Sequence, residues 1–129
     1  MLFRSPVPGP NAALTALISS GLPTHQFLFL GFLPKKSAAV RRILEQWKDF
    51  CGSIIVYESK YKVDKTLELI EEVLGNERLV CMARELTKAH ETILTQRIDQ
   101  LRLTRTQASG KGEFTLVIAP ADYSFHSNQ

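Results

Sequence analysis

Apolar residues along the chain alternate between short continuous runs and one-sided stripes with helical spacing. The runs predict strands at residues 27–33, 53–57, 78–83, 91–95 and 114–118. The stripes predict helices at residues 11–20, 37–51, 60–74 and 97–107, with polar residues on their outer faces. Strands that alternate with helices favour one α/β domain in which helices cover both faces of a sheet.

The predicted strands differ in polarity, and this indicates where each lies in the sheet. Residues 27–33 carry only apolar side chains, which predicts a strand covered on both faces. Residues 91–95 are fewer and more polar, so that strand is expected nearer an edge, and the sheet is mixed if it pairs antiparallel. The predicted fold is a single three-layer α/β/α domain with a mixed sheet of about five strands.

Turn-forming residues mark the ends of the first elements. Asn11 and Ser37 are expected to cap the first two helices with their side-chain oxygens, and Gly21 and Gly52 to end them. Three prolines within residues 6–10 predict extended backbone, so residues 1–10 are assigned to a linker. Residues 11–119 then form the α/β domain, and residues 120–129 form a polar tail.

Composition excludes several classes of protein. Of 129 residues, 44% are hydrophobic and 22% charged, as in a globular domain and unlike a disordered chain or a coiled-coil rod. No apolar run approaches the roughly 18 residues that a membrane-spanning helix needs. Cys51 and Cys81 are too few for a disulfide framework, so we expect reduced core thiols in a cytoplasmic protein.

Several common chemical motifs are missing from the sequence. It contains no glycine-rich phosphate loop and no nucleophile elbow. The three histidines and two cysteines lack the spacing of metal ligands, so no metal site is predicted. Gly110-Lys-Gly112 lies between a helix and a strand, which indicates a plain turn.

Polar clusters follow two of the predicted strands. Tyr57-Glu-Ser59 comes directly after the second strand, and Arg84-Glu-Leu-Thr-Lys-Ala-His-Glu91 after the third. Ligands of open α/β sheets gather beyond the carboxyl ends of strands, so both clusters are candidate functional loops. Ordinary solvated loops have the same composition, and the residues alone leave both interpretations open.

The net charge of +3 is unevenly distributed. Residues 35–65 contain eight basic and four acidic residues, whereas residues 66–101 contain four basic and seven acidic ones. Lys35, Lys36, Arg41 and Arg42 lie before and on the outer face of the second predicted helix. Such a group can bind phosphates of RNA, or it can be no more than a solvated helix face.

A series of short motifs in one order resembles a known superfamily. The motifs are Pro8-Gly-Pro-Asn-Ala12, Ser20-Gly-Leu-Pro23, Phe27-Leu-Phe-Leu-Gly-Phe-Leu-Pro34, Val56-Tyr-Glu-Ser59, Ala83-Arg-Glu-Leu-Thr-Lys88, His90-Glu91 and Lys111-Gly-Glu113. Together they resemble the tetrapyrrole methylase-like superfamily, and within it the bacterial small-subunit ribosomal RNA cytidine 2′-O-methyltransferases. The resemblance extends from about Pro6 to Ala119.

The resemblance implies a two-domain enzyme of which this chain matches the hinge and the second, C-terminal domain. The first domain of the family carries a glycine-rich cofactor loop that has no counterpart here. S-adenosylmethionine lies in the cleft between the two domains, and the family's proteins are homodimers. The implied partners are therefore ribosomal RNA or the small ribosomal subunit, the missing N-terminal domain and a second copy, without a membrane.

The resemblance also implies site residues, taken over position by position. Cofactor contacts are expected at the hinge, at the end of the second strand and at the start of the last strand, namely at Pro8, Gly9, Pro10, Tyr57, Glu58, Ser59, Gly112, Glu113 and Phe114. Glu85, Thr87, Lys88 and Glu91 match a family signature whose chemical role the sequence does not give. No catalytic residue is assigned, although Glu58, Glu85 and Glu113 have the chemistry of a general base.

The chain departs from the family at one place, and its residues leave two other functions open. After Glu58-Ser59 the family usually continues with proline, histidine and arginine, where this chain has Lys60, Tyr61 and Lys62. The same fold could instead act on a porphyrin-like or corrin-like ring. The chain could also be a non-catalytic dimerisation or binding module, because half of a site is not expected to turn over.

Overall fold

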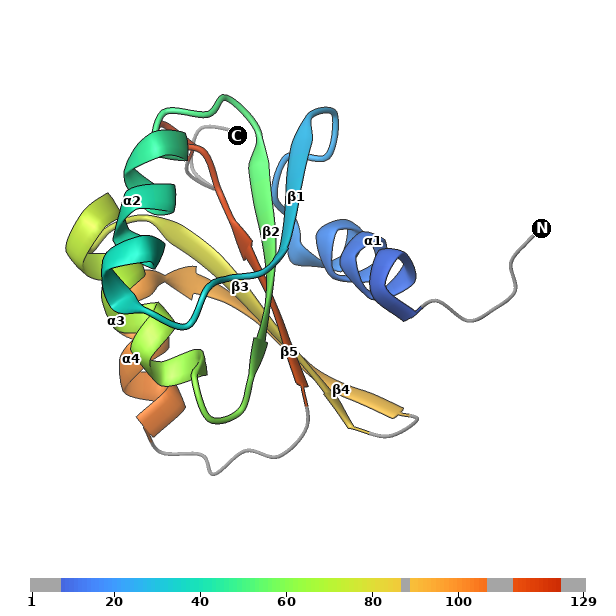
Figure 1. The fold of residues 1–129 in the computed structure, drawn as a ribbon. Coiled ribbons are helices and arrows are strands. Elements are labelled where there is room, and N and C mark those ends of the chain that lie inside the picture. The colour runs from blue at the N-terminus through green and yellow to red at the C-terminus, as the bar shows by residue number, and fades with distance from the viewer. Residues whose placement is uncertain (1–7, 87–88, 107–112, 124–129) are drawn as a thin grey trace.

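The computed structural model describes the backbone of residues 8–86, 89–106 and 113–123 (Figure 1). The elements are α1 (Pro8–Ser20), β1 (Phe27–Phe32), α2 (Ser37–Trp47), β2 (Ser53–Ser59), α3 (Val63–Leu74), β3 (Leu79–Leu86), β4 (Ala89–Arg97), α4 (Ile98–Thr106) and β5 (Glu113–Ile118). The predicted alternation of strands and helices is confirmed.

The strands form one mixed sheet in the order β1-β2-β5-β3-β4. β1 and β2 are parallel, whereas β5 is antiparallel to both β2 and β3, and β4 is antiparallel to β3. The prediction that the fourth strand lies at an edge is confirmed, and its antiparallel pairing makes the sheet mixed.

Helices cover both faces of the sheet, so the predicted three-layer arrangement is confirmed. Figure 1 shows α1 on one face and α2, α3 and α4 on the other. Beneath the three helices lies the larger core cluster, which includes Leu44, Leu67, Ile70 and Leu116. Beneath α1 lies a smaller cluster, in which Ala13, Ala16 and Leu17 of the helix contact the sheet around Ile55 and Val117.

The last strand in the sequence occupies the centre of the sheet. Its residues from Phe114 to Ile118 are all buried, and all but Thr115 are apolar. Full burial of one such large apolar side chain contributes about 1.5–3 kcal/mol to folding. β5 therefore joins the β1–β2 pair to the β3–β4 hairpin and contributes to both cores.

The first strand is not covered on both faces, so that prediction is wrong. β1 is an edge strand, and Phe27, Phe29 and Phe32 remain 42%, 45% and 64% exposed on its α1 face. Leu30 packs against the larger core, and Leu28 lies beside Ile54 of that core in the register. The strand is interrupted by a bulge at Gly31, whose φ of +71° suits glycine. An apolar run alone does not show how much of the strand is covered by other elements.

Several predicted helix ends are also wrong. α1 begins at Pro8, so residues 8–10 are helical rather than extended, and Asn11 lies inside the helix rather than at its cap. Proline fits the first turn of a helix, where no backbone N–H is needed for the helical ladder. α2 ends at Trp47 rather than Cys51, and its N-cap residue is Lys36 rather than Ser37, without a side-chain capping bond. Gly21 has the expected left-handed φ of +78° after α1.

The polar cluster after the third predicted strand is not a loop. β3 continues to Leu86 and β4 begins at Ala89, so most of the cluster lies in a β-hairpin. Ladder hydrogen bonds extend a strand through polar residues when a neighbouring strand is present, which a single-strand pattern does not reveal.

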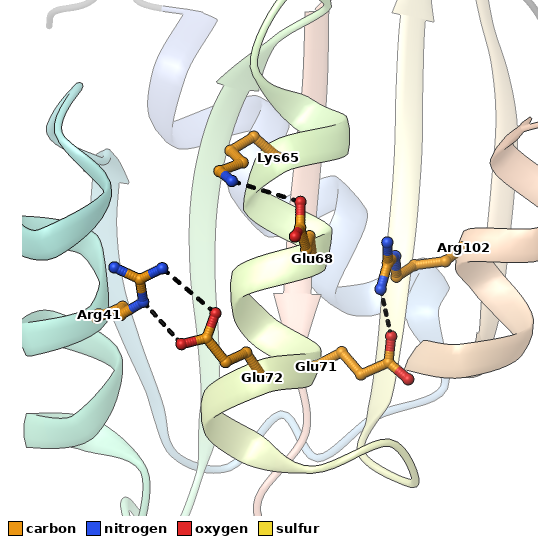
Figure 2. Close-up of polar contacts among 6 residues, drawn as sticks. All are labelled: Arg41, Lys65, Glu68, Glu71, Glu72 and Arg102. Atoms are coloured by element: carbon orange, nitrogen blue, oxygen red, sulfur yellow. Dashed lines mark hydrogen bonds and ion pairs between the residues drawn. The ribbon is translucent and has the colours of Figure 1, made fainter.

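Ion pairs connect the three helices of the outer layer (Figure 2). The Arg41 guanidinium of α2 donates to Glu72 of α3 at 2.7 Å, and Arg102 of α4 donates to Glu71. Arg105 of α4 lies 3.1 Å from Asp64 at the start of α3. An exposed pair such as Arg41–Glu72 contributes only about 0–1 kcal/mol, so it orients the helices more than it stabilises them. The Arg105 guanidinium, by contrast, is buried.

Cysteine reactivity is predicted to differ between the two thiols. Cys51 is exposed and its thiol donates to Gln26 Oε1 at 2.8 Å, so its assignment to the core is wrong. Cys81 is buried as expected, and burial raises the pKa of its thiol. A disulfide-exchange reagent near neutral pH should therefore modify one thiol quickly and the second only on unfolding. Rapid modification of both thiols in the folded chain would contradict this burial.

Gly52 is predicted to tolerate no larger residue, because of the backbone opposite it. A Cβ atom at this position would lie 2.3 Å from the carbonyl oxygen of Gln26, which also accepts the Ser53 N–H at 3.1 Å. We expect Gly52→Ala to lower the free energy of unfolding by about 1–3 kcal/mol, as in other over-packed sites. Urea denaturation measures the change, and Gln46→Ala at a nearby exposed position is the matched control. Equal stability of both variants would contradict the close approach.

Candidate functional site

The carboxyl ends of β1 and β2 and the amino end of β5 meet at one end of the sheet, the lower end in Figure 1. The register places Ser59 opposite Glu113, and Glu113 opposite Glu85. We call Ser59, Glu113 and Glu85 the strand-end row. The structure thus brings three predicted site residues from distant parts of the sequence together across adjacent strands.

The neighbouring row faces the helix-covered core. Glu58 pairs with Phe114 in the register, and both side chains are only 2% exposed. The Glu58 carboxylate accepts a hydrogen bond from Thr66 Oγ1 at 2.7 Å. The Phe114 ring lies 5.2 Å from the Arg105 guanidinium carbon, a cation–π distance. Both side chains therefore support the site from within the core, and a bound molecule can reach only their backbone.

Tyr57 lies on the opposite face of the sheet, with the exposed aromatic residues of β1. Its ring contacts Phe29 and Phe32 edge-to-face, with centroids 5.3 and 5.4 Å apart. Adjacent strand residues point to opposite faces, so Tyr57 and Glu58 cannot contact the same side of a ligand through their side chains. Tyr57 instead belongs to an apolar surface beside the strand-end row.

The structure describes the surroundings of two side chains of the strand-end row, and they differ in exposure. Glu113 is exposed and Ser59 is half-buried. The first turn of α1, residues 8–10, lies apart from the strand-end row in Figure 1, so the structure does not bring these hinge residues to it. Gly112, Thr87 and Lys88 lie outside the described residues, and for Glu85 and Glu91 only the backbone in the β3–β4 hairpin is described.

The four predicted RNA-binding residues do not form one open cluster. Arg41 is paired with Glu72, whereas Lys35, Lys36 and Arg42 are exposed. Arg41 and Arg42 line a shallow groove of about 310 Å³ between α2 and α3, together with Glu45 and Glu72. The acidic residues offset the cations, so this groove is a weaker phosphate site than the spacing of basic residues implies.

Sequence reasoning missed the link between the two loops at this end of the sheet. The Lys62 ammonium donates to the carbonyl oxygens of Pro34 and Lys35, at 2.9 and 3.1 Å. This holds the β1–α2 loop against the β2–α3 loop. Between them Tyr61 is 83% exposed, with the Lys60 ammonium 5.0 Å from its ring centroid. A Lys-Tyr-Lys run directly after a buried strand was the available signal.

At the opposite end of the sheet, a buried arginine connects two segments of the chain beside a cavity. A cavity of about 420 Å³ is lined by residues 74–78 and 121–123. Arg78 in its wall donates to the carbonyl oxygens of Ala119 and Lys48, at 3.1 and 3.3 Å. Burial lowers the pKa of the Arg78 guanidinium, while Asp49 and Asp122 oppose that effect. Arg78 therefore ties the end of β5 to the segment after α2.

Metal and membrane features are limited to what the described residues show. Within that part of the chain, no group of three His, Cys, Asp or Glu residues is placed to hold a metal ion. No helix among the described elements is long and apolar enough to cross a bilayer.

Comparison with curated proteins gives relatives that are named as small-subunit ribosomal RNA methyltransferases. The chain is 43% identical over 113 residues to "Ribosomal RNA small subunit methyltransferase I" of Halalkalibacterium halodurans, which covers 88% of this chain and 39% of the relative. Proteins of the same name from Hydrogenobaculum and Escherichia coli O157:H7 are 44% and 41% identical, over 88% of this chain and 49% and 40% of their own lengths. The chain thus spans less than half the length of these relatives.

Comparison with solved structures agrees on the fold. The methyltransferase CobJ matches with a TM-score of 0.57 at 18% identity, over 84% of this chain and 47% of its own. The cobalt precorrin-4 methyltransferase CbiF matches with a TM-score of 0.58 at 11% identity, over 84% and 48%. The family model "Tetrapyrrole (Corrin/Porphyrin) Methylases" matches residues 5–102. Together with the curated relatives, this match shows that the chain belongs to the tetrapyrrole methylase family.

Proposed function

We propose that this chain is the C-terminal domain of an S-adenosylmethionine-dependent ribosomal RNA methyltransferase. The proposed substrate is the 2′-oxygen of a cytidine in small-subunit ribosomal RNA, modified in the cytoplasm. The observation that carries the proposal is the identity of about 43% to relatives named as small-subunit ribosomal RNA methyltransferases. Because the chain spans less than half of those relatives, we also propose that it is inactive without an N-terminal, glycine-rich domain.

The strand-end row fits the chemistry of the methyl donor. S-adenosylmethionine carries ribose hydroxyls and an ammonium group, and both donate hydrogen bonds that carboxylate and hydroxyl oxygens accept. The exposed carboxylate of Glu113 and the half-buried hydroxyl of Ser59 are such acceptors, on adjacent strands. Glu58 and Phe114, buried behind this row, fix the strands that present them. We propose that Ser59 and Glu113 hold the donor against the missing domain.

The chemistry requires alignment above all. The donor supplies an electrophilic methyl group on a positively charged sulfur, and the methyl passes to a ribose 2′-oxygen whose proton must go to a base. Rigid alignment of two reactants can supply about 7–11 kcal/mol of the barrier reduction, whereas a general base contributes about 10²–10⁴-fold in rate. The buried Glu58 is held by Thr66 and is poorly placed to contact a ribose. We assign no catalytic residue within this chain.

The exposed apolar residues of α1 and β1 support the proposed partners. Leu14 and Ile18 of α1, and Phe27, Phe29 and Phe32 of β1, are all more than 40% exposed. Large apolar side chains that remain exposed can mark a surface that another protein covers. We propose that the missing N-terminal domain and the second copy of a homodimer contact this side of the molecule.

Two alternatives remain distinguishable by experiment. The aromatic surface of Phe29, Phe32 and Tyr57 suits a flat porphyrin-like or corrin-like ring, and a spectroscopic titration with such a ring tests that substrate class. A non-catalytic binding module would associate with a partner without methyl transfer. The exposed cations and the names of the curated relatives favour RNA.

Donor binding is predicted to need both domains and to depend on Glu113. We expect the chain alone to bind S-adenosylmethionine weakly or not at all in calorimetry. Fused to the part of the Halalkalibacterium relative that it does not span, it should bind the donor and methylate small ribosomal subunits. Glu113→Ala in the fusion should weaken donor binding about tenfold, the effect of removing a hydrogen bond to a charged group.

Glu45→Ala, which removes an exposed carboxylate from α2, is the matched control for Glu113→Ala. Micromolar donor binding by the chain alone would contradict the need for a second domain. If Glu113→Ala and Glu45→Ala bind the donor equally well, Glu113 does not contact the donor.

The two arginines of α2 are predicted to differ in their effect on binding to small ribosomal subunits. Arg42→Glu should weaken binding and reduce its salt dependence, because Arg42 is free to contact phosphate. Arg41→Glu places a carboxylate against Glu72, so it should also lower the unfolding temperature. Filter binding at several salt concentrations measures the first effect, with Lys65→Glu on α3 as control. Binding that is unchanged in Arg42→Glu would reject a role for Arg42.

A further inference from the structure

The loop between β2 and α3 presents an aromatic ring within a group of cations. Residues 59–62 form a turn closed by the Lys62 N–H, which donates to the Ser59 carbonyl at 3.1 Å. Tyr61 projects from this turn with 83% of its surface exposed, more than any other described large hydrophobic residue. The Lys60 ammonium lies 5.0 Å from the ring centroid and holds the ring by a cation–π contact.

The neighbouring loop adds two further cations. Lys35 and Lys36 are exposed in the β1–α2 loop, which the Lys62 ammonium holds through the carbonyls of Pro34 and Lys35. We call Lys35, Lys36, Lys60 and Tyr61 the basic rim. Within the described residues, no acidic side chain lies within ion-pair distance of these three lysines.

The acidic residues nearest in sequence to the rim are already engaged. Glu58 is buried and accepts from Thr66, and Asp64 lies 3.1 Å from the Arg105 guanidinium. The rim therefore keeps its positive charge at the surface. This distinguishes it from the groove between α2 and α3, where Glu45 and Glu72 lie beside the two arginines.

The rim lies next to the strand-end row. Ser59 is both the end of β2, opposite Glu113, and the first residue of the turn that carries Tyr61. A nucleotide stacked on Tyr61 would thus be bound beside the residues proposed to hold the methyl donor.

We propose that the basic rim binds single-stranded RNA, with one base stacked on Tyr61 and flanking phosphates on Lys35, Lys36 and Lys60. Surfaces that bind single strands combine cations along the backbone with aromatic rings under the bases, because every base has a flat face. A duplex keeps its bases stacked inside and cannot use the ring in this way. The inference rests on the proposed RNA methyltransferase function and names the surface of this chain that contacts the substrate.

Fluorescence anisotropy with a labelled 12-nucleotide single-stranded RNA of mixed sequence tests the proposal on this chain. Tyr61→Leu keeps an apolar side chain but removes the aromatic face, and should weaken binding by about fivefold or more. Tyr61→Phe should bind as the unchanged chain does. Lys35→Ala with Lys36→Ala should flatten the salt dependence, by about 0.7 in slope for each phosphate that the lysines no longer neutralise.

Lys65→Ala is the matched control, because it removes an exposed lysine of α3 that pairs with Glu68 outside the rim. Thermal unfolding of each variant shows whether the fold is retained, as expected for a side chain as exposed as Tyr61. The proposal is overturned if the unchanged chain does not bind the RNA, if Tyr61→Leu binds equally well, or if Lys65→Ala weakens binding as much.

Two further measurements separate this inference from competing explanations. If Tyr61→Leu weakens binding to phosphatidylserine vesicles but not to RNA, the loop binds membranes and the proposal is overturned. Failure of the fused protein to methylate ribosomal subunits would reject the proposed function, while Tyr61-dependent RNA binding would still support the rim. If the fused protein transfers the methyl group but RNA binding does not depend on Tyr61, the proposed function is supported and the role of the basic rim is rejected.

Discussion

The structure depends on the pairing of β5 with both β2 and β3. Without that strand the sheet would consist of a parallel pair and a separate hairpin, neither of which buries enough apolar surface to be stable alone. β5 meets this requirement because its five residues from Phe114 to Ile118 are buried on both faces. The same pairing fixes the register that brings Ser59, Glu113 and Glu85 side by side. Core formation and construction of the candidate site are therefore consequences of one set of backbone hydrogen bonds.

Because side chains alternate along a strand, neighbouring residues at the strand ends have different roles. Glu58 and Phe114 lie among core residues, whereas their neighbours Ser59 and Glu113 lie where a ligand can reach them. The cost of burying the Glu58 carboxylate is reduced by the hydrogen bond from Thr66. That bond also connects the end of β2 to α3, the helix that follows the Tyr61 turn. The buried Glu58 thus connects the strand end that carries the accessible Ser59 to α3.

Much of this arrangement could be predicted from the sequence, and the exceptions have physical causes. The three-layer class and the buried positions of α4, such as Ile98 and Leu101, follow from apolar spacing. The exposure of Phe29 and the hairpin around Leu86 did not follow, because both depend on which strand lies alongside. The site residues came from a family resemblance, and only the register shows which of them share an accessible row. The pairing of Arg41 with Glu72 joins residues of two helices, so charge patterning along one segment could not reveal it.

No strand of the described part of the chain pairs with the outer side of β1, and this affects the behaviour of the molecule in concentrated solution. An unpaired strand edge presents backbone hydrogen-bond donors and acceptors to any extended segment. In most proteins, charged residues on the edge strand prevent such pairing. β1 has no charged residue between Phe27 and Phe32, and its one irregularity is the bulge at Gly31. Self-association through this edge should therefore increase with protein concentration, and a shielding subunit or domain would protect the chain from aggregation.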